Sequence, residues 1–179
     1  MRRPSESGRA IHSPNTAGGI EFVRLPEIDT ASLSRLVNDP RVRRHMPLGE
    51  GGMSEANFRE WVRRKERIWD EHGFGPWAIR IKGMFAGWGG LQPWDGDVEV
   101  ALVLMPEFWG WGKAIFERFA EQAFRQLQLT HVLAALPPTR RRGRGLLRLG
   151  FTPVGDAEIE GRAFVVYRLD APPTYGSRG

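Results

Sequence analysis

The sequence of 179 residues contains no cysteine. Disulfide frameworks, thiolate metal sites and a cysteine nucleophile are therefore excluded. Long hydrophobic runs are also missing: no segment reaches membrane-spanning length, and the first thirty residues hold no apolar signal-peptide region. No two histidines stand at metal-ligand spacing, so we predict no metal cofactor. These absences favour a cytoplasmic protein without membrane contacts.

Positive charge is present but unevenly distributed. The net charge is +5 and the isoelectric point is near 10.4. Much of the excess lies at the ends, with Arg2, Arg3 and Arg9 near the N-terminus and Arg178 near the C-terminus. A further run of arginines falls within residues 140–144. Because the basic residues are concentrated locally, we do not expect a nucleic-acid partner.

Three segments differ in composition. Residues 1–19 and 171–179 are polar, rich in Pro, Gly and Ser, and aperiodic, which predicts two disordered tails. Residues 20–170 have the composition of one globular domain, in a chain that is 41% hydrophobic. A domain of this length buries a substantial core.

Hydrophobic periodicity predicts alternating strands and helices within this domain. Strands are expected at 20–25, 77–81, 84–92, 98–105, 130–136, 151–159 and 162–170, and helices at 30–37, 54–73, 115–127 and 140–149. This order predicts the α/β (α+β) class, with helices flanking a mixed, mostly antiparallel sheet and with β–α–β crossovers late in the chain. Strand 98–105 is apolar on both faces in its second half, so we expect it at the centre of the sheet.

Several residues mark where these elements begin and end. Thr30 and Ser54 are expected to cap the first two helices, and Gly73 is expected to end the second. Lys82-Gly83 and Asp95-Gly96 are typical of two-residue hairpin turns.

The stretch PEFWGWGKA at 106–114 connects the central strand to a helix. The first N–H groups of a helix lack intrahelical partners and lie at the positive end of its dipole. Gly110 and Gly112 would let an anion such as phosphate approach the backbone closely. Glycines alone do not decide the matter, because tight strand-to-helix turns also use them for steric reasons.

The surrounding residues make this stretch more specific. Residues 109–114, Trp-Gly-Trp-Gly-Lys-Ala, resemble the pyrophosphate loop of the GNAT superfamily of N-acetyltransferases, whose pattern is Gln/Arg-x-x-Gly-x-Gly/Ala. Trp109 at the first place resembles the Trp-Gly-x-Gly-Tyr-Ala form of the RimL/RimJ-like branch. The Asp-Gly hairpin, the strand before the loop and the helix after it also follow the family order, as does LLRLGF at 146–151, which stands where the family has Lys-Leu-Gly-Phe.

This resemblance implies the GNAT fold over residues 20–170 and acetyl-CoA as the acetyl donor. The diphosphate is expected on the backbone of the loop, where the implied cofactor-binding residues are Trp109, Gly110, Trp111, Gly112, Lys113 and Ala114. The pantetheine arm is expected to pair with strand 98–105 where that strand parts from 130–136. A backbone N–H near Leu104 would polarise the thioester carbonyl.

The resemblance also suggests a general base but no general acid. Glu99 stands where many relatives carry a glutamate base, although a solvated glutamate beside a hairpin is an equal alternative. Many relatives carry a tyrosine acid four residues before the Gly of Gly-Phe, and here that position is Leu146. Tyr167 is expected to be a core residue on the closing strand.

Basic and histidine residues near the implied site have two interpretations each. Arg140 and Arg142, with their arginine neighbours, either bind phosphates of coenzyme A or form a solvated helix face. His45 falls in the region that lines the acceptor side in relatives, but a surface or half-buried role is more common for such a histidine. His131 is expected to be structural.

These observations predict an enzyme that moves an acetyl group from acetyl-CoA to a primary amine. A peptide N-terminus is the acceptor most consistent with the RimL-like resemblance. Two alternatives remain: an acetyltransferase for a small amine such as a polyamine, amino acid or antibiotic, and a degenerate module that binds coenzyme A without turnover. Both monomer and homodimer are compatible with the sequence.

Overall fold

The computed structural model describes residues 18–46, 54–138 and 143–173. Most of both predicted tails, together with Arg140 and Arg142, lies outside these ranges. The strands are β1 (Ile20–Val23), β2 (Pro76–Ile81), β3 (Met84–Trp94), β4 (Asp97–Leu104), β5 (His131–Leu136), β6 (Thr152–Ile159) and β7 (Arg162–Asp170). The helices are α1 (Thr30–Asn38), α2 (Pro40–Arg43), α3 (Glu55–His72), α4 (Gly112–Glu121) and α5 (Arg144–Arg148), with short 3-10 turns η1 (Leu25–Glu27) and η3 (Pro106–Trp111) and a π turn η4 (Gln122–Gln126).

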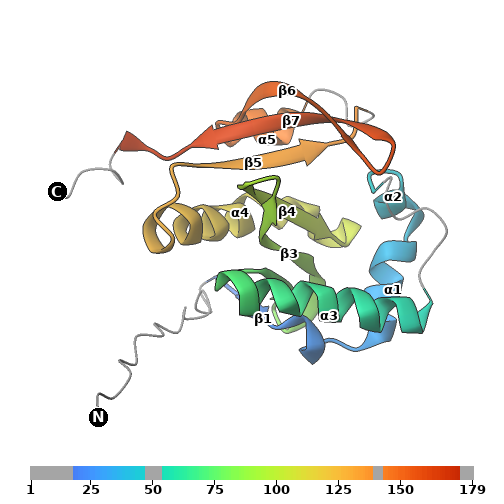
Figure 1. The fold of residues 1–179 in the computed structure, drawn as a ribbon. Coiled ribbons are helices and arrows are strands. Elements are labelled where there is room, and N and C mark those ends of the chain that lie inside the picture. The colour runs from blue at the N-terminus through green and yellow to red at the C-terminus, as the bar shows by residue number, and fades with distance from the viewer. Residues whose placement is uncertain (1–17, 47–53, 139–142, 174–179) are drawn as a thin grey trace, which may run out of the picture.

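The strands form one sheet in the order β1-β2-β3-β4-β5-β7-β6 (Figure 1). Neighbouring strands are antiparallel, except that β4 and β5 are parallel and are connected through α4. The predicted fold class is therefore confirmed, as is the central position of β4. β5 and β6 are joined through α5, and β7 lies between them.

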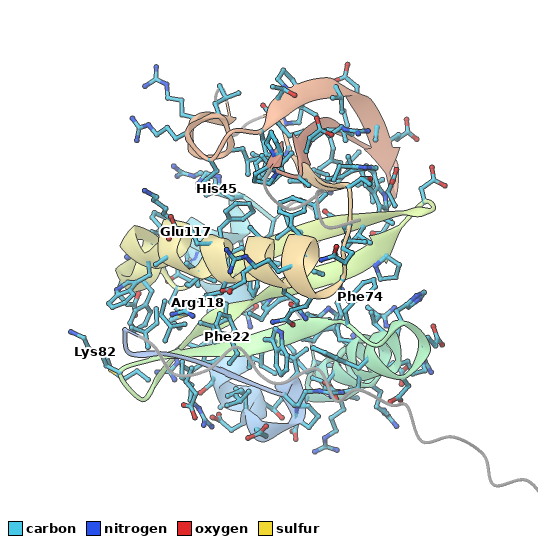
Figure 2. The ribbon with its side chains drawn as sticks, turned by 90° about the vertical axis from the view of Figure 1, so that its left-hand side faces the viewer. Phe22, His45, Phe74, Lys82, Glu117 and Arg118 are labelled. Atoms are coloured by element: carbon cyan, nitrogen blue, oxygen red, sulfur yellow. The ribbon has the colours of Figure 1, made fainter. Side chains whose placement is uncertain are left out.

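Helices cover both faces of the β1–β4 half. α3 lies on one face, where the ring of Trp61 meets the ring of Trp88 on β3 edge-on at 5.1 Å. α4 lies across the opposite face (Figure 2). There the ring centroid of Phe119 is 5.4 Å from that of Phe22 on β1. α1 packs beside α3 and contacts β3. The central strands are thus enclosed between apolar helix faces.

Some of the predicted helix starts and ends agree with the structure, and others differ from it. Ser54 caps α3 by accepting from the Asn57 N–H, and Gly73 ends it in a left-handed conformation, as predicted. The cap of α1 is Asp29, whose carboxylate accepts from the Ser32 N–H, so the prediction of Thr30 was wrong by one residue. Helix α2 was not predicted. It begins at Pro40, because a proline at the first helical position is compatible with a helix.

None of the helices in the described part of the chain is both long enough and apolar enough to span a lipid bilayer.

Candidate active site

The two edges of β4 differ sharply. Towards β3, every residue from Asp97 to Leu104 has a paired partner. Towards β5, the described register contains a single pair, Glu99 with Leu133. Ala101, Leu102 and Val103 stay only half-buried, although they lie in the central strand of the sheet. β4 and β5 therefore separate beyond Glu99, and the described register pairs no later β4 residue with β5.

The pairing of β4 with β3 sets the direction of the Leu104 backbone. The Met105 N–H donates to the Ala86 carbonyl at 2.8 Å, and pairs in an antiparallel ladder alternate between bonded and non-bonded. Leu104 pairs with Gly87 at a non-bonded position, so its N–H and carbonyl point away from β3, towards the gap. The Trp109 indole N–H donates to the Leu104 carbonyl at 3.0 Å. The Leu104 N–H thus points away from β3 and towards β5, as required for the predicted role of a backbone N–H near Leu104 in polarising the thioester carbonyl.

Gly87 explains how β3 approaches β4 so closely at this point. Its φ is +152°, and a Cβ there would lie 2.1 Å from the Val103 carbonyl oxygen. Only glycine is compatible with both conditions. The sequence analysis did not detect this requirement, although the GWGG stretch of β3 was a visible signal.

The loop after β4 is a 3-10 turn that leads directly into α4. A Cβ on Gly110 or Gly112 would meet no described atom within 4 Å, so the space beside both glycines is open. In the described structure α4 has no side-chain cap, which leaves backbone N–H groups of its first turn without a side-chain partner. One predicted donor is already used, because the Gly112 N–H donates to the Trp109 carbonyl. Lys113 and Ala114 lie next along the helix.

Glu99 lies where β4 and β5 begin to separate. Its half-buried carboxyl accepts from the Gln92 side-chain Nε2 at 2.9 Å. Burial raises the pKa of Glu99 above its ordinary value, while the Gln92 hydrogen bond, the Lys65 charge and the Ala135 backbone N–H act in the opposite direction. A carboxylate with a raised pKa is a better proton acceptor than a freely solvated one.

Two residues of this cluster were missed by the sequence analysis. Lys65 on α3 donates to Gln92 Oε1 at 2.6 Å, and Gln92 lies directly opposite Glu99 in the β3–β4 ladder. Both signals were present in the sequence. Lys65 occupies the apolar face of its helix, and the Asp95-Gly96 hairpin fixes Gln92 as the partner of Glu99.

The remaining predicted residues fall around the cluster. His131 Nε2 lies 2.8 Å from Asp97 Oδ1. Asp97 is two residues before Glu99 on β4, and His131 is two residues before its partner Leu133 on β5. The ring of His45 lies 6.3 Å from that of Trp109, so His45 is beside the loop. Tyr167 is buried in the core, and Leu146 packs against that core from α5.

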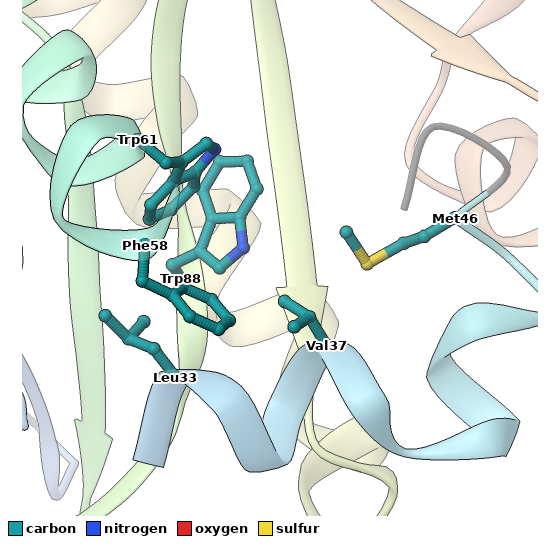
Figure 3. A pocket seen from close by; sticks show the side chains of 6 residues that line it. All are labelled: Leu33, Val37, Met46, Phe58, Trp61 and Trp88. Carbon is teal, nitrogen blue, oxygen red and sulfur yellow. The ribbon is translucent and has the colours of Figure 1, made fainter. Parts of the chain in front are cut away.

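An apolar pocket lies on the same sheet face as Glu99, between α1, α3 and β3 (Figure 3). The residues that line it are Leu33, Val37, Met46, Phe58, Trp61 and Trp88. Trp88 pairs with Val103, two alternate positions along β4 from Glu99. The Cα atoms of Val103 and Glu99 are therefore roughly 13 Å apart along the strand.

Comparison with known proteins places the chain in a family. The model of the acetyltransferase (GNAT) domain matches residues 20–152. The chain is a member of the GNAT acetyltransferase family. It is an acyltransferase, and this family uses acetyl-CoA as its donor.

Solved structures share the GNAT fold at low sequence identity. An acetyltransferase from Agrobacterium tumefaciens strain C58 is 18% identical with a TM-score of 0.69, and the match covers 94% of this chain and 98% of the other. A GNAT acetyltransferase from Bacillus anthracis is 15% identical with a TM-score of 0.70, covering 87% and 97%. RimL, a ribosomal L7/L12 alpha-N-protein acetyltransferase in complex with coenzyme A, is 16% identical with a TM-score of 0.71, covering 89% and 98%. At these identities the similarity shows the fold alone.

Proposed function

We propose that this GNAT acetyltransferase transfers the acetyl group of acetyl-CoA to an α-amine, such as a peptide N-terminus, with Glu99 as the general base. The observation that carries the proposal is the half-buried Glu99 carboxyl at the point where β4 and β5 separate. The acceptor nitrogen gives a proton to this carboxylate, directly or through water, as it forms its bond to the acetyl carbon. The sulfur of the donor leaves as a thiolate with the electron pair of the broken carbon–sulfur bond, and it then takes a proton from solvent.

The residues around the gap fit an acetyl-CoA molecule. The open space at Gly110 and Gly112, together with the uncapped start of α4, suits a diphosphate at the helix N-terminus. The β4 backbone groups that face the gap suit an extended amide-containing arm. The Leu104 N–H is aimed to hydrogen-bond a carbonyl oxygen placed there.

The choice of an α-amine rests on the cost of deprotonation. A lysine-type amine has a pKa of about 10.4 and an α-amine one of about 7.7–8.0, so neutralising them at pH 7 costs about 4–5 and about 1 kcal/mol, respectively. Lys65 adds a positive charge within the Glu99 cluster, which disfavours a second ammonium group nearby. The less demanding acceptor fits this site better. RimL, which acts on an alpha-amino group, has the same fold.

The test compares two peptides of identical sequence. One has a free N-terminus and blocked lysine side chains, and the other has a blocked N-terminus and one free lysine. We expect kcat/KM to be at least tenfold higher for the free N-terminus. Faster turnover of the lysine peptide would contradict the proposal, and preferential turnover of a free polyamine or amino acid would assign the enzyme to small-molecule amines instead.

A further inference from the structure

Lys65 is held at an unusual place for a lysine. It projects from α3 towards β3, with its Nζ 5.2 Å from the ring centroid of Trp88 and 5.8 Å from that of Trp61. The faces of indole rings attract cations, and these two rings also pack edge-on against each other. The same Nζ donates to Gln92 Oε1 at 2.6 Å. Lys65 is therefore a fixed cation with a specific hydrogen-bond partner, unlike an ordinary surface lysine.

The chemistry of lysine determines how the Gln92 amide is oriented. An ammonium group has donors only, so the atom of Gln92 that faces it must be the carbonyl oxygen. The amide nitrogen then faces the opposite way and donates to Glu99 Oε2 at 2.9 Å. An ionised carboxylate accepts such a bond more strongly than a neutral acid does. The two hydrogen bonds therefore have the same direction: Lys65 donates to Gln92, and Gln92 donates to the Glu99 carboxylate.

Without the ammonium group, the Gln92 amide would be free to rotate by half a turn. Its oxygen would then face Glu99 and would accept a hydrogen bond from the neutral carboxylic acid, so the protonated form would be favoured. The orientation of one side-chain amide therefore distinguishes the two protonation states of Glu99.

The groups around Glu99 come from three elements. From α3 there is Lys65, whose own pKa is lowered by burial and by the charge of Arg64 and raised by the charge of Glu99. From β3 there is Gln92, and from β5 there is the Ala135 N–H. Along the same face, Asp97 is bonded to His131. Among these groups Lys65 is the one whose charge reaches Glu99 through a hydrogen-bonded side chain.

We propose that Lys65 is a positioning residue that locks the Gln92 amide so that Glu99 is held as a carboxylate ready to take the acceptor proton. We call this orientation of the Gln92 amide by Lys65 the lock, and it is a property of the folded chain. Only the use of Glu99 as the proton acceptor rests on the proposed function, so the two are tested separately.

The lock is tested by NMR titration of protein labelled with ¹³C at the glutamate carboxyl carbons. The Glu99 signal is assigned as the one missing in Glu99→Gln. We expect its titration midpoint to move to higher pH in Lys65→Met by roughly 0.5–1 pH unit. This is less than the 1–3 units that a directly contacting opposite charge produces, because Gln92 lies between. Lys65→Arg, which keeps the charge and the donors, should restore most of the wild-type midpoint.

Arg67→Met is the matched control, because it removes one exposed positive charge from the same helix. Its Glu99 midpoint should stay at the wild-type value. If Lys65→Met is unstable, Lys65→Leu, which also removes both the charge and the hydrogen-bond donors, provides the same comparison. A midpoint that is unchanged in either neutral variant would overturn the lock.

Turnover then separates the lock from the proposed role of Glu99. If both hold, the acid limb of the kcat/KM profile moves to higher pH in Lys65→Met and much of the activity returns at alkaline pH. A merely structural loss would lower activity equally at every pH, with no shift of the midpoint, and would count against the lock. A shifted NMR midpoint with an unshifted rate profile would support the lock and remove Glu99 as the base.

Discussion

The two edges of β4 share one backbone but have opposite properties. On the β3 edge the ladder is continuous, and the strands approach so closely that Gly87 has no room for a side chain. On the β5 edge the described register pairs Glu99 alone, and Ala101, Leu102 and Val103 are half-buried. The β3 side of β4, which we call the closed edge, holds the strand in place. The β5 side, which we call the open edge, carries the Glu99 carboxyl and the Leu104 N–H, to which we assign roles in the reaction.

The contrast between the two edges explains how backbone N–H and carbonyl groups of β4 can remain unpaired without unfolding of the sheet. An unpaired strand edge inside a protein normally costs free energy, because its N–H and carbonyl groups lose their partners. Here the Trp109 indole N–H donates to the Leu104 carbonyl, so this carbonyl has a partner although it does not pair with β3. The closed edge and the enclosing helices keep the backbone groups of β4 in place, as the proposed binding of the acetyl donor requires.

The largest expected effect comes from Glu99, at the point where the open edge begins. Glu99→Gln keeps the shape of the side chain but removes the proton acceptor. We expect kcat/KM to fall by roughly 10²–10⁴-fold, the usual contribution of a general base, with little change in acetyl-CoA binding. Steady-state kinetics and calorimetry measure the two quantities. A loss below about tenfold would remove Glu99 from this role.

Gly87→Ala tests the closed edge. The added Cβ would lie 2.1 Å from the Val103 carbonyl oxygen, at a φ that alanine rarely adopts. We expect a loss of about 3 kcal/mol or more in the free energy of unfolding, since a backbone clash and a strained φ act together. Gly83→Ala is the control, because that glycine also has a positive φ but a Cβ there meets no described atom within 4 Å. Equal destabilisation of both variants, measured by denaturant unfolding, would assign the effect to φ alone.

Much of the fold could be predicted because its signals are local. The hairpins at Lys82-Gly83 and Asp95-Gly96 are two-residue turns of residues with positive φ, and the register of β3 with β4 follows from the second turn. Helix α3 follows from its periodicity, with Ser54 at its start and Gly73 at its end. The cap of α1 was misplaced by one residue, because Asp29 and Thr30 are both good capping residues and only the three-dimensional structure distinguishes them.

The candidate site was harder to predict because its residues meet across elements. Glu99 and the loop at 109–114 were found through the family resemblance, and their roles remain predictions. Lys65 was not predicted, since its position on the apolar face of α3 does not show that its ammonium reaches Gln92 on β3. Similarly, the clash that a Cβ at Gly87 would make with the Val103 carbonyl oxygen depends on how tightly two strands pack, which the spacing of residues along the chain does not encode.

Gly112→Asp tests the loop at the end of the open edge. Space beside this glycine is open and its φ is −54°, so the variant should fold normally, and an acidic residue at a helix start is favourable for stability. The added carboxylate would repel a diphosphate placed at the helix N-terminus. We expect affinity for coenzyme A to fall by roughly a hundredfold, which corresponds to about 2.7 kcal/mol.

Gly112→Ala is the matched control for this variant, because it adds the Cβ without the charge. Calorimetry with coenzyme A should show a smaller loss for alanine than for aspartate. Wild-type affinity in the aspartate variant would place the diphosphate elsewhere and would leave the glycines of this loop to a purely steric role.

The smallest expected effect concerns the hydrogen bond from the Trp109 indole in the loop to the open edge of β4. Trp109→Phe keeps an aromatic ring but removes the indole N–H that donates to the Leu104 carbonyl. A neutral hydrogen bond of this kind contributes about 0.5–1.5 kcal/mol, so the KM for acetyl-CoA should rise by roughly two- to tenfold. The melting temperature should change little, because the ladder with β3 is untouched. Trp94→Phe makes the same chemical change at the far end of β3 and should leave the KM for acetyl-CoA at the wild-type value. An unchanged KM in Trp109→Phe would mean that the closed edge alone positions Leu104, and the contrast between the two edges would then not depend on the loop.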